Sequence, residues 1–112
     1  MSERRILSAI MRSRDVFGQI ESVMDVEEDF TTQGGVIASK IKDYYDNDKN
    51  AEYVDKEFLI DSIKLDLPHN WQSFQGIIEG LPEVSLPNVL QEFRKLQQGA
   101  AAQRLAEALL AK

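Results

Sequence analysis

Cysteine is absent from the sequence, and histidine occurs once, at His69. The lack of thiols excludes a disulfide framework, a thiolate metal site and a cysteine nucleophile, and it suits a reducing cytoplasm. With a single imidazole and no thiolate, neither a zinc site nor a nucleophile–base pair can be assembled from side chains typical of such sites. No apolar run approaches the roughly 18 residues of a membrane-spanning helix, so no membrane contact is expected.

Positive charge is also scarce, since 13 Lys and Arg stand against 19 Asp and Glu, for a formal net charge of −6. This balance argues against a domain whose main work is coating nucleic acid, where affinity comes largely from cations that neutralise phosphates. Two local basic clusters indicate a mixed solvated surface, and for the first of them a minor nucleic-acid role is the alternative. They comprise Arg4, Arg5, Arg12 and Arg14 near the start and Arg94, Lys95 and Arg104 near the end.

What is present is helical periodicity. The 112 residues are 43% hydrophobic, enough for one small domain with a modest core. Apolar residues recur at three- and four-residue spacing, strand-like alternation is missing, and no segment repeats, so the sequence predicts an all-α fold. Expected boundaries are an N-cap at Ser2, caps at Asp15 and Asp55, a connector DVEEDF at 25–30 anchored in the core by Phe30, a glycine turn at 34–35 and a stop at Pro68. Tyr44, Phe58, Trp71 and Leu81 are expected to point inward.

The stretch DNDKNAEYVDKEF, residues 46–58, resembles a calcium loop. Asp46, Asp48 and Asn50 occupy positions one, three and five, and Glu57 occupies position twelve. Position six, which turns sharply in such loops, is Ala51 rather than glycine, and no second loop of this kind exists. We therefore interpret the stretch as a solvated connector between helices. Similarly, GGVIASK at 34–40 lacks the second glycine and the hydroxyl residue of a phosphate loop.

The segment from about Leu86 to Leu110 carries the longest helical pattern in the chain. Gly99 either breaks this segment into a hairpin or weakens a continuous helix by about 1 kcal/mol. Its apolar stripe is long relative to the head that could cover it, which indicates a protein–protein surface. The alternative is that the stripe folds back on its own head, as most helical stripes do. The residues expected to face a neighbouring subunit or partner helix are Val89, Leu90, Phe93, Leu96, Leu105 and Leu109.

The order of these motifs resembles the opening of the DnaB-type replicative DNA helicases, with the closest match to those of tailed phages. In that family an acid precedes an apolar pair, as Glu3 precedes Ile6–Leu7, and a second helix leads to an acidic residue and a phenylalanine, as in 28–30. NVLQEFRKLQQGAAAQRLAEAL resembles the first arm of the family's helical hairpin. The family's usual tyrosine is replaced by Thr31, and its second hairpin arm and motor domain lie outside this sequence.

The resemblance implies a small helical bundle head at residues 1–82, followed by a linker and long amphipathic helix at 83–112, with the ATPase motor absent from this chain. It implies a non-catalytic assembly and docking domain, which supports a helicase hexamer and binds primase or a loader in the cytoplasm of a bacterial or phage-infected cell. No cofactor is expected here, because ATP and magnesium belong to the motor of the parent ATP-dependent helicase; DNA contact is expected to be weak or indirect. The alternative is a stand-alone phage adaptor or inhibitor that binds a replication component through its C-terminal helix.

Overall fold

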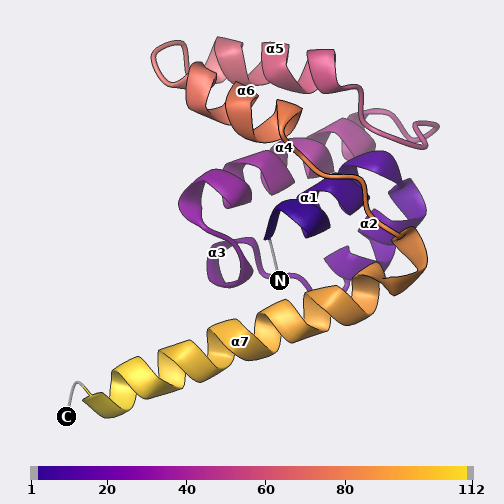
Figure 1. The fold of residues 1–112 in the computed structure, drawn as a ribbon. Helices are drawn as coiled ribbons and strands as arrows, with labels where there is room; N and C mark the ends of the chain where they lie inside the picture. The colour runs from indigo at the N-terminus through magenta and orange to yellow at the C-terminus, as the bar shows by residue number, and fades with distance from the viewer. Residues whose placement is uncertain (1–2, 111–112) are drawn as a thin grey trace.

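A computed structural model describes the backbone of residues 3–110 and the side chains of residues 3–25 and 28–99. Over this range the chain is helical throughout and forms no strand, which confirms the all-α prediction (Figure 1). The elements are α1 (Glu3–Arg12), α2 (Arg14–Glu21), α3 (Val26–Asp29), α4 (Thr32–Asn47), α5 (Lys56–Asp66), α6 (Trp71–Glu79), a 3₁₀ turn η1 (Leu86–Asn88) and α7 (Val89–Leu110).

Helices α1 and α4 form the central layer of the head. The α5–α6 pair packs against α4 on one side through α5, while α2 and the start of α7 pack against α1 on the other, and α3 lies between α4 and α7 (Figure 1). The later part of α7 runs on beyond the head, which gives the molecule extents of 45 × 35 × 23 Å. Within residues 3–110, no helix combines the length and apolar content needed to cross a bilayer.

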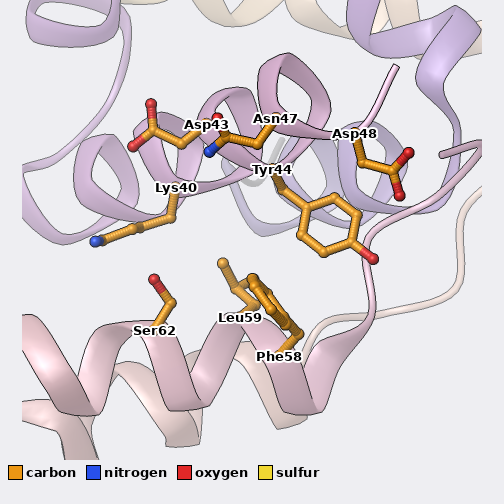
Figure 2. Close-up of a pocket in the computed structure, with 8 residues that line it drawn as sticks. All are labelled: Lys40, Asp43, Tyr44, Asn47, Asp48, Phe58, Leu59 and Ser62. Atoms are coloured by element: carbon orange, nitrogen blue, oxygen red, sulfur yellow. The ribbon is translucent and has the colours of Figure 1, made fainter. Parts of the chain in front are cut away.

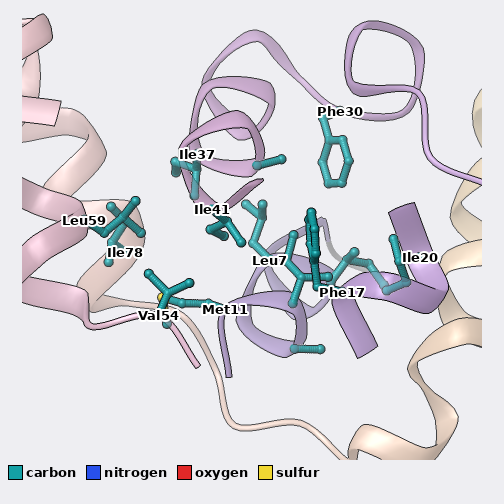
Figure 3. Packing of buried hydrophobic residues seen from close by; sticks show 14 of the residues in the cluster. Leu7, Met11, Phe17, Ile20, Phe30, Ile37, Ile41, Val54, Leu59 and Ile78 are labelled. Atoms are coloured by element: carbon teal, nitrogen blue, oxygen red, sulfur yellow. The ribbon is translucent and has the colours of Figure 1, made fainter. Parts of the chain in front are cut away.

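Helix α1 is enclosed on all sides. Every residue from Ile6 to Met11 is buried, because α2, α4 and α7 each cover part of its circumference. Ser8, the polar residue of this run, donates to Pro82 O, and the apolar residues around it are stable in water only because they are surrounded in this way. Its neighbours in the core include Phe17, Ile37 and Ile41, and the cluster extends to Val54, Leu59 and Ile78 at the α5–α6 side (Figure 3).

The carbonyl groups at the end of α1 bond to partners from three separate segments. The Ser13 N–H donates to Ala9 O at 3.1 Å, and the Val54 N–H donates to Met11 O at 2.7 Å. The buried Tyr45 hydroxyl donates to Ile10 O at 2.7 Å. Since the last carbonyls of a helix lack partners within it, these bonds tie α1 to α4 and to the loop before α5.

Several predicted helix boundaries differ from the structure. Ser13, rather than Asp15, caps α2, since its hydroxyl accepts the Val16 N–H at 3.3 Å. Asp55 caps α5 as predicted, accepting the Glu57 N–H at 2.9 Å. The expected Ser2 cap lies outside the described residues. The DVEEDF connector contains the single-turn helix α3, and α7 continues through Gly99 without a break, so the hairpin alternative is wrong.

The inward face of two helices, α4 and α5, was also predicted incorrectly in part, whereas the predicted inward residues Trp71 and Leu81 do pack against the core. Phe58 is 59% exposed, and Leu59, its neighbour in sequence, takes the buried position. In α4 the fully buried ring is that of Tyr45, with Tyr44 half-buried beside it. Trp71 and Leu81 are half-buried at the edge of the core. The reason is that adjacent apolar residues differ by about 100° around a helix, and only the packing partner decides which of them turns inward.

Gly34 and Gly35 do not open a turn, because both lie inside the first turns of α4 and no described residue has a positive φ. What Gly34 provides is room for the Glu3 carboxylate. The Thr31 N–H and hydroxyl donate to the two oxygens of Glu3 at 2.6 and 2.8 Å, and the Thr31 hydroxyl accepts the Gly34 N–H at 3.1 Å. A Cβ at Gly34 would overlap this carboxylate. The chain thus places its own anion at the positive end of α4.

We expect Gly34→Ala to change the free energy of unfolding with opposite sign in two backgrounds. In the wild type the added methyl displaces Glu3 and costs about 0.5–1.5 kcal/mol through the lost charge-assisted hydrogen bonds. In a Glu3→Ala background the same substitution stabilises by up to about 1 kcal/mol, because alanine is the better helix former. Urea unfolding of the four proteins of this cycle measures the difference. An identical effect in both backgrounds would contradict the proposed contact.

Candidate functional site

The first residues of α7 belong to the core of the head. Val89 is 1% and Phe93 0% exposed, and the Phe93 ring stacks on Phe30 with centroids 6.1 Å apart. Leu90 and Leu96 are half-buried against the same core. The prediction that Val89 and Phe93 face a partner therefore needs correction, since both side chains are buried in the core of the protomer itself. The core also extends beyond the predicted head boundary at residue 82.

Polar contacts fix the direction in which α7 leaves the head. Arg5 donates two hydrogen bonds to the Glu92 carboxylate, at 2.9 and 3.1 Å, and these bonds lower the pKa of Glu92 below its usual range. The ion pair therefore stabilises the fold at pH values above the usual pKa range of a glutamate. This contribution is lost as the pH falls through that range towards the lowered pKa of Glu92. One turn further on, the Gln97 side-chain amide donates to Val23 O at 2.7 Å and to Asp29 Oδ2 at 3.0 Å.

The remaining predicted contact residues, Leu105 and Leu109, lie outside the residues whose side chains the structure describes. Their positions along α7 still carry information, since the helix continues to Leu110. Leu105 follows Phe93 by twelve residues, which on a regular helix is a rotation of about 120°. Helix α7 therefore does not carry a single apolar stripe along its whole length. The positions that contact the head lie on a different side of the helix from the apolar positions of 101–109.

The loop that resembles a calcium site is organised around an arginine. Arg14 Nη1 donates to Asp48 O at 2.7 Å and to Ala51 O at 3.0 Å, and Nη2 donates to Tyr45 O at 3.0 Å. The guanidinium thus occupies the point at which the carbonyls at the end of α4 and in the following loop converge, where a cation is favoured by the helix dipole.

The acids of the same loop have partners within the chain. Asp46 accepts a hydrogen bond from Lys42 at 2.7 Å, and Asp48 accepts the Asn50 N–H at 3.1 Å. Among the described residues, no three His, Asp or Glu side chains are grouped closely enough to hold a metal ion.

Of the residues in the two basic clusters, Arg5 and Arg14 form hydrogen bonds within the protein. Arg94 and Lys95 are exposed, and Arg104 lies outside the described side chains.

A groove between α4 and α5 was missed by the sequence reasoning, because Phe58 was assigned to the core. The groove has a volume of about 460 Å³, and its lining side chains face one another across the two helices (Figure 2). The exposed Phe58 ring meets Tyr44 edge-on, with centroids 5.2 Å apart. A signal was available: Phe58 and Leu65 are seven residues apart, a helical repeat that lies outside the stripe formed by Leu59, Ile60 and Ile63.

Comparison with known proteins identifies no relative: no family model matches the chain, and neither a curated protein nor a solved structure shows significant similarity to it.

Proposed function

We propose that this chain is a non-catalytic assembly and docking domain of a replicative DNA helicase of the DnaB type. In this role the head and the start of α7 form one unit, and the later part of α7 packs against neighbouring subunits or partner proteins. Self-association towards a hexamer and binding of primase or a loader are the activities that this assignment entails. The ATP-dependent motor would be supplied by a separate domain of the parent helicase.

The observation that supports this proposal most directly is the way in which α7 leaves the head. Its first turns are held by Phe93, Glu92 and Gln97, and the helix then extends past the head to Leu110 (Figure 1). In this later part the sequence continues to place apolar residues at helical spacing, at Leu105 and Leu109. An apolar helix face left over by its own domain is typical of an assembly surface.

Leu105→Asp is expected to weaken self-association of the chain at least about tenfold, because a carboxylate in an apolar helix contact loses its hydration without gaining a partner. Light scattering after gel filtration, at a series of concentrations, measures the association. Helical content by circular dichroism should stay close to that of the wild type.

Gln103→Asp is the matched control, since it adds the same charge to the same stretch of α7 at a position about 200° away from Leu105. It should associate like the wild type. Two results would count against the proposal: a single-protomer mass for the wild type throughout the accessible concentration range, or equal loss of association in the two variants. A large loss of helicity in Leu105→Asp would instead place this residue in the core of the protomer.

A further inference from the structure

The groove between α4 and α5 combines an apolar part with a polar and charged part. Tyr44 and Leu59 provide apolar walls, and Phe58 stands at the rim with 59% of its surface exposed (Figure 2). A volume of about 460 Å³ lies within the range of sites that hold ligands or anchoring side chains. Exposure of a large aromatic ring at such a rim costs free energy in water, and this cost is recovered when a partner covers it.

The apolar surface continues along α5 beyond the groove. Leu65 is 83% exposed, the highest value among the large apolar side chains described. It lies seven residues after Phe58, so the two side chains share one face of α5 at a separation of about 10 Å. Ser62, between them on this face, lines the groove. Two apolar contact points at this separation match two leucines spaced i and i+7 on a helix laid alongside α5.

The charge at the groove is negative. Lys40, the one basic residue of its lining, forms an ion pair with Asp66. Within the part of the chain whose side chains are described, no lysine or arginine pairs with Asp43 or Asp48, which lie on the opposite wall from Phe58 (Figure 2). An occupant with basic residues beside its apolar ones would neutralise these two carboxylates.

From these contacts we infer that the α4–α5 groove docks an amphipathic helix of another protein, with apolar residues spaced i and i+7 and flanked by Lys or Arg. This surface lies across the α1–α4 layer from α7 (Figure 1). The head would therefore bind this partner helix independently of any assembly through α7, and variants of one surface leave the other in place.

The probe is a fluorescein-labelled peptide about four helical turns long, with leucines at i and i+7 and lysines on either side of them. Fluorescence anisotropy against the intact chain should show saturable binding. The same peptide with glutamates in place of the lysines should bind at least about tenfold more weakly. Phe58→Ser and Leu65→Ser should each reduce affinity for the basic peptide about tenfold, and Asp43→Asn about threefold.

Controls come from other exposed positions away from the groove. Val23→Ser removes another exposed apolar side chain, and Asp15→Asn removes another exposed carboxylate; both should bind the peptide as the wild type does. Because Leu65 is almost fully exposed, its variant tests the site without a change in folding, which circular dichroism verifies.

Absence of binding, equal binding of the basic and acidic peptides, or equal weakening by Val23→Ser would each overturn the inference. Light scattering without peptide provides a further test. If Phe58→Ser or Leu65→Ser lowers the measured particle mass, the occupant of the groove is a second copy of this protein rather than a different protein. That result would also overturn the inference. Failure of Leu105→Asp to affect self-association, by contrast, bears on the α7 proposal alone.

Discussion

Phe93→Ala is expected to destabilise the protein by about 3–5 kcal/mol. The ring is fully buried and stacks on Phe30, so truncation removes its transfer free energy and leaves a cavity that the surrounding helices fill only in part. A loss of this size is a large share of the 5–15 kcal/mol that typically stabilises a domain. Urea unfolding followed by circular dichroism measures it, and a lower midpoint with early loosening of α7 is the expected result.

The matched control is Phe58→Ala, the same chemical change at a ring that is 59% exposed. It should cost about 0.5–1.5 kcal/mol, from the edge contact with Tyr44 and the smaller buried area. The comparison also separates the two roles considered for Phe93. If this residue served a partner rather than the protomer, Phe93→Ala and Phe58→Ala would be equally mild in the isolated chain, and the core position described above would be wrong.

Tyr45→Phe is expected to cost about 1–3 kcal/mol at neutral pH. The hydroxyl donates to Ile10 O at 2.7 Å and also lies 3.2 Å from Met11 O. Met11 O has a second donor in the Val54 N–H, so Ile10 O bears most of the loss when the hydroxyl is removed. A buried carbonyl without a donor carries its desolvation penalty uncompensated. Thermal and urea unfolding of the variant and the wild type provide the measurement.

The same hydroxyl gives the wild type a distinctive response to alkaline pH. Burial raises the pKa of Tyr45 above its ordinary value near 10, and the nearby Arg14 opposes this effect only in part. In the folded protein Tyr45 therefore keeps its hydroxyl proton at pH values at which it loses this proton in the unfolded chain. The contribution of Tyr45 to the free energy of unfolding is fully present below pH 10. It falls as the pH rises further, with a slope of up to about 1.4 kcal/mol per pH unit.

Tyr45→Phe has no such proton, so the difference in unfolding free energy between the wild type and this variant should shrink above pH 10. Tyr53→Phe, which removes the hydroxyl of a ring that is 64% exposed, should follow the wild-type curve and serves as the control. Parallel curves for the wild type and Tyr45→Phe up to the alkaline limit of folding would show that the Tyr45 hydroxyl is not buried as described.

The sequence carried enough information to identify the longer helices, because apolar spacing and the Asp55 cap are local signals, but not the single-turn α3. It did not decide between neighbours such as Phe58 and Leu59, or Tyr44 and Tyr45, since each pair offers two similar side chains to a core that only tertiary packing locates. Asp15 was predicted to cap α2 and Ser13 does so instead; both residue types favour this position, so the residue type alone does not identify the cap.

No local sequence signal predicts the polar contacts between residues far apart in the chain. Glu3 meets Thr31, and Arg14 meets the carbonyls after α4, through pairings that no periodicity or spacing specifies. The glycine pair was predicted to open a turn, and it makes room for a carboxylate instead. The loop that resembles a calcium site was interpreted as a solvated connector, and it surrounds a guanidinium. The sequence reasoning predicted neither charged group at its place.

The contact between the two ends of the head has a consequence for synthesis. Arg5 and Glu92 are separated by 87 residues, and α7 packs against α1. While the chain emerges from the ribosome, the part of α1 that contacts α7 remains uncovered until α7 has been translated. Pairing of such distant segments slows folding, so a nascent chain halted before Val89 is a natural client for chaperones.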